Sequence, residues 1–386
     1  MSTTELRTPR VQQRIYGLDA LRAVAMLLGI VLHATIAYKV FPEPGWPFDN
    51  RFHSWPLEIL YEFIHAFRMP LFYLVAGFFA HMVYLKTGET AFIQHRMKRI
   101  GLPFIISLIF ILPLSMLPFL YNRYYIQEQH STAASWHLLT SQLKHWNGMA
   151  HLWFLYYLMM FYVAMLVLNR IRIPLAIRFN FSAPLPLLLL GIITTLILGI
   201  FFDTPTVGVY TGIMPQPGIF AFYGFFFFLG YQLYTRQEQL EDIALRTWPN
   251  IVTGLVLTLL VCYLLWAAPP HLNPWLVKAA VALQTIFLIF GIMGFFLKYL
   301  NKANQTLRYI SDASYWMYLF HMCWIAGLQL YFLYTGVPGW LRFWMVLILT
   351  HVITLLTYQW FIRYTFIGNI LHGPRERPAK KARAVL

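Results

Sequence analysis

The chain has 386 residues, of which 59% are apolar, 18% aromatic and only 11% charged. So few charged residues exclude a soluble globular protein of this length and indicate a polytopic membrane protein. The formal net charge is +15 at pH 7, but no basic patch accompanies a nucleic-acid recognition motif. We therefore expect no nucleic-acid partner and attribute the charge to membrane topology and to contact with anionic membrane lipid.

Ten apolar stretches approach the length of about 20 residues that a helix needs to cross a bilayer. They predict an all-α polytopic membrane protein with about ten transmembrane helices. Hydropathy leaves open an eleventh short or re-entrant segment. The expected spans are 18–40, 57–85, 100–121, 151–169, 184–202, 218–234, 250–268, 274–297, 311–333 and 339–364.

Lysine and arginine residues gather in alternate connecting segments. Most of the 29 Lys and Arg residues lie before the first span, in every second connection and after the last span. Positive residues beside membrane helices mark the cytoplasmic side, so both termini are expected in the cytoplasm. The predicted organisation is a cytoplasmic N-terminal segment over 1–17, a single transmembrane domain over 18–366 and a basic cytoplasmic tail over 367–386.

Three ionisable residues, Asp19, Arg22 and His33, share one face of the first span. The eleven positions from Arg22 to His33 bring a helix back to within about 20° of its starting direction, about 16 Å further along its axis. Each ionisable group in hydrocarbon costs roughly 2.5 kcal/mol or more and by default marks a water-filled or ligand-filled passage. The structural alternative is an ion pair between Asp19 and Arg22 near the membrane surface, with His33 bonded to a neighbouring carbonyl group.

The second span carries four ionisable residues at spacings of four, three and three. Glu58, Glu62, His65 and Arg68 therefore occupy one side of the predicted helix. Two interpretations remain open. The row is either a salt-bridge network near the outer membrane boundary or a set of groups that line the same cavity as His33.

The ninth span repeats this pattern in its first half. Ser314, Tyr318 and His321 follow at spacings of four and three, so they share a face. An imidazole deep in this helix is suited to orient a substrate or another histidine. The alternative is a core histidine that is satisfied by a hydrogen bond, as buried histidines normally are.

The longest outward connection, over 122–150, carries four aromatic residues and three histidines. Its aromatic residues, which include Tyr125, Trp136 and Trp146, suit either sugar binding or anchoring at the membrane interface. We expect this connection to be a loop that covers the outer mouth of the protein. The histidines are too widely spaced for a typical zinc site, so no metal is predicted.

Five segments of the chain resemble, in order, the conserved blocks of the membrane acyltransferase-3 family. The resemblance covers essentially the whole chain, and its second block is most similar to the branch that adds succinyl groups to periplasmic glucans. The segments are RIYGLDALRAVAMLLGIVLH (14–33), FIHAFRMPLFYLVAGFF (63–79), HRMKRIGLPF (95–104), HLWFL (151–155) and SYWMYLFH (314–321).

The resemblance implies an enzyme of the bacterial inner membrane. Family members take an acyl group from cytoplasmic acyl-CoA, here succinyl-CoA or acetyl-CoA, and deliver it to a hydroxyl of a carbohydrate on the far side. The expected acceptor is a periplasmic or other extracytoplasmic glycan such as a glucan. Acyl-CoA is a donor substrate, and no permanently bound cofactor is expected.

The donor side of this reaction needs cations for the phosphates of coenzyme A. Arg96, Lys98 and Arg99 stand just before the third span and are candidate phosphate ligands, although they also serve to set topology. Asp19 and Arg22 are expected to pair with each other and hold the donor end, because both lie too far from His33 to contact it.

The acceptor hydroxyl needs a base, for which an imidazole is suited near neutral pH. His33 is the candidate base. Arg68, Tyr318 or His321 would donate hydrogen bonds to the oxyanion of the tetrahedral intermediate. Glu62 and His65 are expected to line the substrate site beside them.

An alternative of another class is a secondary transporter or flippase. Asp19, Glu62, His65 and His33 would then form a proton relay, and no covalent transfer would occur. Transporters of this size commonly contain internal repeats, and the two halves of the chain show no convincing similarity. The sequence therefore favours the enzyme.

Overall fold

The protein is a bundle of long helices. The computed structural model describes residues 15–144, 148–171, 180, 183–269 and 271–375, and this part of the chain contains no β-strand. Each of the ten expected spans coincides with a long helix. These are α1 (Tyr16–Thr35), α2 (Trp55–Thr87), a bent helix from α3 (Glu89–Arg96) to Gln127, α7 (Trp153–Arg170), α8 (Pro184–Phe201), α9 (Pro217–Tyr234), α11 (Thr247–Trp266), α12 (Pro274–Tyr299), α13 (Gln305–Leu333) and α14 (Gly339–Thr357).

Nine helical stretches in the described residues are long and apolar enough to cross a membrane. The tenth long helix, α9, is an 18-residue helix that packs along α2 inside the bundle. It is not among those nine, and its sequence includes three tyrosines, three glycines and Gln232. Because neighbouring helices cover it, α9 needs less apolar surface than a helix that faces lipid.

The third long helix exceeds its expected bounds of 100–121 and is bent. It continues from Glu89 to Gln127 through α4 (Leu102–Ile106) and α5 (Leu112–Tyr121). Pro103 and Pro113 each follow a π-helical turn, at 97–101 and 107–111. A proline lacks the amide hydrogen that a regular turn requires, and a π-turn absorbs this defect without ending the helix.

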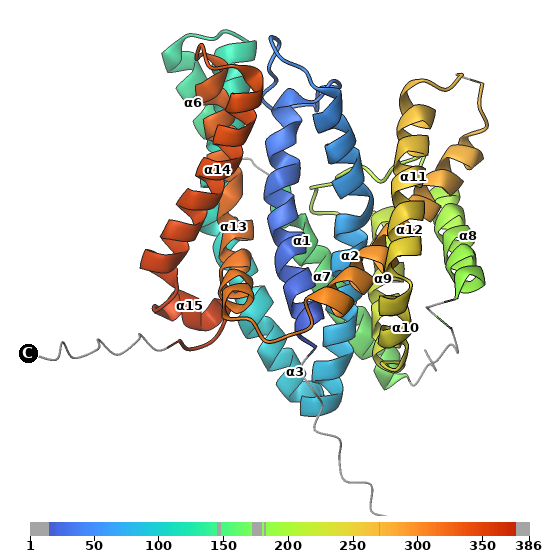
Figure 1. Ribbon diagram of the computed structural model, residues 1–386. Helices are drawn as coiled ribbons and strands as arrows, with labels where there is room; N and C mark the ends of the chain where they lie inside the picture. Colours follow the sequence, from blue (N-terminus) through green and yellow to red (C-terminus); the bar gives the residue numbers. More distant parts are fainter. Residues whose placement is uncertain (1–14, 145–147, 172–179, 181–182, 270, 376–386) are drawn as a thin grey trace, which may run out of the picture.

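The short helices separate the two ends of the bundle (Figure 1). Helices α3, α10 (Gln239–Leu245) and α15 (Phe366–Leu371) lie at one end, and α6 (Thr132–Lys144) lies at the other. The basic connections after α2, α9 and α14 adjoin α3, α10 and α15, so they gather at one end. That this end faces the cytoplasm stays a prediction. Residues 1–14 and 376–386 of the expected terminal segments lie outside the described part of the chain.

Helix α2 is held at the centre of the bundle by close contacts with α9 and α12. A Cβ atom at Gly77 would overlap the carbonyl of Phe227, and one at Gly230 would overlap the carbonyl of Leu74. Both glycines are therefore needed for the α2–α9 approach. Pro70 frees the carbonyl of Ala66, four residues earlier, and Thr285 of α12 donates a hydrogen bond to it at 3.0 Å.

Candidate functional site

Three histidines from separate parts of the sequence meet inside the bundle. His33, two residues before the end of α1, stacks on His321 of α13 with ring centroids 5.4 Å apart. The ring of His151, which precedes α7, meets His321 nearly edge-on at 5.5 Å. On its other side, His33 stacks on Trp46 at 5.3 Å, with the planes only 10° apart. We call His33, His151 and His321 the histidine cluster.

Hydrogen bonds to backbone carbonyls orient two members of the cluster. His151 Nε2 donates to Leu319 O at 3.1 Å, and His321 Nδ1 donates to Tyr318 O at 2.7 Å. Because a carbonyl oxygen only accepts, each ring carries its proton on that nitrogen, and the other nitrogen is an acceptor. Those acceptors, His151 Nδ1 and His321 Nε2, are buried without a partner, as is His33 Nδ1. His321 is thus satisfied at only one of its two nitrogens.

Arg68 brings an unpaired positive charge to the cluster. Its guanidinium occupies the space that a side chain at Gly29 would fill, and its charge acts on His33 and His65. Its Nε is buried without a hydrogen bond, and no carboxylate of the described residues forms an ion pair with it. A lone charge in the interior is costly, so this position suits an anionic or partially negative ligand group.

Glu58 belongs to a separate network, which we call the outer network, at the end of the bundle that carries α6 (Figure 1). Its carboxylate accepts a hydrogen bond from Phe41 N at 2.9 Å and lies 3.4 Å from Lys39 Nζ. Lys39 also donates to Glu43 at 2.6 Å. Glu62 lies within electrostatic range of the same three charges, those of Lys39, Glu58 and Glu43. The salt-bridge interpretation therefore holds for Glu58, at the start of the row on α2.

The far end of that row lies near His33. That its groups line one cavity with His33 stays a prediction. Arg68 adjoins the histidine cluster, three helical turns from Glu58. Between them, His65 stacks on Tyr61 with centroids 5.5 Å apart, and the charges of Arg68 and Glu43 both act on it. The row on α2 thus links the outer network to the cluster.

A cationic cavity opens beside the first half of α1, at the end of the bundle that carries α3 and α15. It has a volume of about 330 Å³, and we call it the inner cavity. Four arginines and one carboxylate of the described residues line it: Arg22, Arg96, Arg99, Arg375 and Asp312. The excess of positive charge suits a polyanionic ligand.

Two of these arginines are held by acidic partners. Arg375 donates two hydrogen bonds to Asp312, both 2.8 Å long. Arg22 Nη2 lies 3.6 Å from Asp19 Oδ1, so the predicted pairing of these residues is present. Lys98, by contrast, is exposed and does not line the inner cavity. The structure thus brings Arg22, Arg96 and Arg99 together and leaves Lys98 outside.

His372 lines the inner cavity without adding a charge at neutral pH. Burial lowers the pKa of its imidazole below the ordinary value of 6.5. Its Nδ1 donates to Gly373 O at 2.7 Å, and its Nε2 is buried without a partner. The ring therefore offers a hydrogen-bond acceptor among the arginines.

Aromatic rings connect the inner cavity with the histidine cluster. Tyr315 lines the cavity and lies nearly parallel to Tyr318, with centroids 6.4 Å apart. The hydroxyl of Tyr318 donates to the carbonyl of His151 at 2.8 Å. Phe154 also lines the cavity and packs edge-on against Tyr318. The cluster thus adjoins the inner end of this cavity.

A second cavity, of about 760 Å³, lies at the opposite end of the bundle, and we call it the outer cavity. It is formed by the loop over 39–54, by the end of the bent helix at Asn122 and by the end of α13 at Tyr334. Trp46 lines this cavity and also stacks on His33. One indole ring therefore adjoins both the cavity and the histidine cluster.

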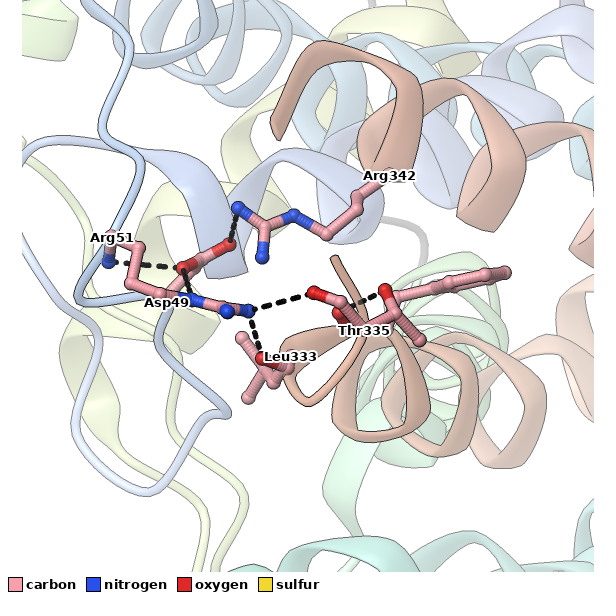
Figure 2. A network of polar contacts seen from close by, with 6 residues as sticks. Asp49, Arg51, Leu333, Thr335 and Arg342 are labelled. Carbon is pink, nitrogen blue, oxygen red and sulfur yellow. Dashed lines mark hydrogen bonds and ion pairs between the residues drawn. The ribbon is translucent and has the colours of Figure 1, made fainter. Parts of the chain in front are cut away.

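A buried ion pair fixes the loop that carries Trp46 (Figure 2). Asp49 Oδ2 lies 2.7 Å from Arg342 Nη2 of α14, and both side chains are almost fully buried. Asp49 also accepts a hydrogen bond from Arg51 N at 3.0 Å. The Arg51 guanidinium donates to the carbonyls of Leu333 and Thr335 after α13. The loop is thus tied to two helices that do not adjoin it in sequence.

The connection over 122–150 was expected to be a loop, but part of it is helical. It contains helix α6, which brings Trp136 and Leu139 to one face at helical spacing. Trp136 and Tyr125 line a third cavity, of about 740 Å³, between this region and α13. Trp146 lies outside the described residues. The outer cavity is therefore formed mainly by the shorter loop over 39–54.

Sequence reasoning missed several residues of this site. His151 stands in the segment HLWFL, which was noted for its resemblance but not for its imidazole. Trp46 lies in a Pro- and Gly-rich loop that gave no sign of contact with α1. Asp312 and Arg375 are 63 positions apart, and only the fold pairs them.

Comparisons with known proteins identify the family. The sequence model of the Acyl_transf_3 acyltransferase domain matches residues 15–359. Relatives named glucans biosynthesis protein C, from Salmonella paratyphi B, Salmonella heidelberg and Salmonella dublin, are each 33% identical over 146 residues. That match covers 37% of this chain and 35% of each relative, about a third of their length. No solved structure matches the chain. Because the domain extends over nearly the whole chain, the protein is a membrane acyltransferase that belongs to the acyltransferase-3 family.

Proposed function

We propose that the protein is an O-acyltransferase that moves a succinyl or acetyl group from acyl-CoA to a hydroxyl of a glycan such as a glucan. The donor would bind from the cytoplasm and the acceptor from the far side of the bacterial inner membrane. One observation carries this proposal: the histidine cluster lies between a cationic inner cavity and an outer cavity, and contacts residues that line each. The glucan is suggested by the name of the relatives.

The inner cavity suits the donor because coenzyme A carries several phosphate groups. Arg22, Arg96 and Arg99 line the cavity, and guanidinium groups bind phosphate oxygens in pairs. No step of the proposal needs a permanently bound cofactor. Both termini would lie on this side, in agreement with the basic residues that gather there.

A matched pair of variants tests the donor site. Arg99→Gln removes a guanidinium from the inner cavity and should raise the KM for acyl-CoA about tenfold, the loss expected for one charge-assisted hydrogen bond. Lys98→Gln removes a neighbouring charge that is exposed outside the cavity and should leave this KM unchanged. Steady-state kinetics with washed membranes give both values. Equal effects of the two substitutions would show that only the general basic charge of this segment matters.

His33 is the proposed base, because its Nδ1 is buried without a partner and its ring lies between both cavities. It would accept the proton of the acceptor hydroxyl while the hydroxyl oxygen attacks the thioester carbonyl. When the tetrahedral intermediate collapses, the carbon–sulfur bond breaks and the departing thiolate takes up this proton. His321 is placed to hold the His33 ring in position. A two-step route through an acyl group on His33 would use the same nitrogen as nucleophile.

Arg68 is the proposed partner for negative charge on the acyl group. Two such charges fit its unpaired guanidinium: the oxyanion of the intermediate, and the terminal carboxylate of a succinyl group. Tyr318 already donates its hydroxyl to His151, so it is less available for the oxyanion than Arg68 is. Glu62 and His65 would line the acceptor side of the same space.

Substitution of Arg68 by glutamine distinguishes these two roles. If the guanidinium binds the succinyl carboxylate, Arg68→Gln should lower kcat/KM for succinyl-CoA at least tenfold and leave that for acetyl-CoA nearly unchanged. If it stabilises the oxyanion, transfer from both donors should fall together, by roughly a hundredfold or more. A reaction in which succinyl-CoA and acetyl-CoA, each with a different isotope label, compete for the acceptor measures the ratio of their kcat/KM values. Unchanged transfer from both would remove Arg68 from the site.

The structure gives no support to the proton relay of a transporter. Asp19, the first proposed member of that relay, pairs with Arg22 beside the inner cavity. Between Asp19 and His33 lie four turns of apolar α1. Family membership also identifies an acyltransferase.

The product of the reaction tests the proposal directly. Mass spectrometry of envelope glycans should find a hydroxyl-linked acyl group in cells that express the wild-type chain and not in cells that lack it. The mass of the group separates succinyl from acetyl. No acyl difference in any glycan fraction, with the protein present in the membrane, would contradict the proposed function.

A further inference from the structure

We infer that the outer cavity is the binding site for the acceptor, and that it takes a neutral carbohydrate chain through Trp46 and Asn122. This inference rests on the proposed function and adds to it the place and the chemical class of the acceptor. The cavity, of about 760 Å³, has room for a few sugar units.

The lining of the cavity combines aromatic faces with amide groups. Trp46, Phe48 and Tyr334 supply rings, and Asn50 and Asn122 supply amides. A pyranose ring presents C–H groups on its faces and hydroxyls around its rim, so it stacks on the first type of group and hydrogen-bonds to the second. This pairing of surfaces is what a carbohydrate site requires.

Asn122 gives an independent sign that a ligand is missing. Its side chain is only 3% exposed, yet its Nδ2 has no hydrogen-bond partner. Buried amide donors are normally paired, because leaving one unpaired is unfavourable. Asn122 lines the outer cavity, so a hydroxyl of the bound acceptor would satisfy this donor.

The charges around the cavity offer no cluster of free cations for an anionic ligand. Among the described residues that line it, Arg51 is the only lysine or arginine, and its guanidinium is already bound to the carbonyls of Leu333 and Thr335. Arg342, behind the wall, is neutralised by Asp49. The two carboxylates of the lining are also paired, Glu43 with Lys39 and Asp49 with Arg342. The outer cavity thus contrasts with the inner cavity, where arginines predominate, and favours a ligand without phosphate.

Trp46 contacts both the proposed acceptor site and the proposed base, His33. Its ring lines the cavity and lies parallel to the His33 ring, 10° apart in plane, while Phe119 packs edge-on against it at 4.9 Å. A sugar held in the cavity therefore lies one aromatic ring away from the proposed base. Asp49 and Arg342 are positioning residues, because their ion pair fixes the loop that carries this ring.

Kinetics of cavity variants test the inference. Trp46→Ala and Asn122→Leu should each raise the KM for a β-linked glucan oligosaccharide about tenfold and leave the KM for acyl-CoA unchanged. Trp46→Phe keeps an aromatic face and should retain most of the affinity. The matched control is Trp136→Ala, which removes an exposed indole from the neighbouring third cavity and should have no effect.

Binding without a donor separates this inference from the proposed function. Isothermal titration calorimetry of the wild-type protein with the oligosaccharide alone should show binding. Asn122→Leu should raise the Kd of this binding about tenfold. Transfer that proceeds with an unchanged acceptor KM in Trp46→Ala and Asn122→Leu would overturn the inference while leaving the proposed function intact. A KM raised by Trp136→Ala instead would place the acceptor in the third cavity and overturn it as well. Binding of the oligosaccharide with no transfer to it would support the cavity site and contradict the function.

Discussion

Replacement of His33 by alanine should lower the kcat of acyl transfer by a factor of roughly 10² to 10⁴, the usual contribution of general acid–base catalysis. The acceptor hydroxyl would then lack its proposed proton acceptor, which lies between the two cavities. The helix itself should persist, because alanine is the best helix former and is apolar. The measurement is kcat per folded protein, with folding checked by the thermal midpoint in detergent.

His81 provides the matched control for this substitution. It is also a buried histidine of a membrane helix, but it stacks on Tyr231 at 3.7 Å and its Nδ1 donates to the carbonyl of the same residue. His81→Ala should therefore cost stability and leave kcat nearly unchanged. A His33→Ala protein that keeps more than about a tenth of the wild-type kcat would remove His33 from the role of base.

Replacement of Arg342 by alanine should destabilise the protein by about 3 to 5 kcal/mol, because it leaves the Asp49 carboxylate buried without a counter-charge. Arg342 is 4% exposed and Asp49 is 1% exposed, and the two atoms of the pair are 2.7 Å apart. The loop that carries Trp46 would also lose its tie to α14. Chemical or thermal unfolding in detergent measures the loss.

Two further variants separate the ion pair from its surroundings. Arg51→Ala removes a neighbouring guanidinium that is 55% exposed and 3.9 Å from Asp49, so it should cost only about 1 kcal/mol or less. The double variant Asp49→Ala/Arg342→Ala should be more stable than Arg342→Ala alone, because no buried charge remains. Equal losses from Arg342→Ala and Arg51→Ala would contradict this account of the pair.

The helices of the fold could be predicted because the bilayer imposes a length on them. An apolar run of about 20 residues has few alternatives in a membrane, so all ten expected spans became helices. Their exact extents could not be predicted. The helix that ends at Gln127 starts eleven residues before its expected beginning at 100, because π-turns allow it to pass through prolines. Helix α6 was missed because it is short and only weakly amphipathic.

The candidate site could be predicted in part from the cost of ionisable groups in a membrane. That cost singled out Arg22, His33, Arg68 and His321, and the structure places the last three together. It could not separate Glu58, which has a structural partner, from Arg68, which has none, because both look alike in sequence. Only the packing of helices shows which charge is neutralised.

Two residues of the site, Trp46 and His151, were not singled out by this argument: Trp46 lies in a loop, and His151 is the first residue of the expected span 151–169. Trp46 contacts His33 because the buried ion pair between Asp49 and Arg342 fixes its loop. The local sequence does not predict that pair. His151 joins the cluster through α7, which follows it. Contacts between residues far apart in the chain follow from three-dimensional packing, which a single sequence does not determine.

The central claim is that the histidine cluster joins two cavities that open at opposite ends of the bundle, so that donor and acceptor meet from opposite sides of the membrane. Proteoliposomes that enclose a glucan oligosaccharide, with labelled acyl-CoA added only outside, test it most directly. Protein oriented with the inner cavity outward should transfer the label to the enclosed glucan as a base-labile ester, and His33→Ala should not. Label that reaches glucan only when donor and acceptor share one side of the membrane would contradict the account.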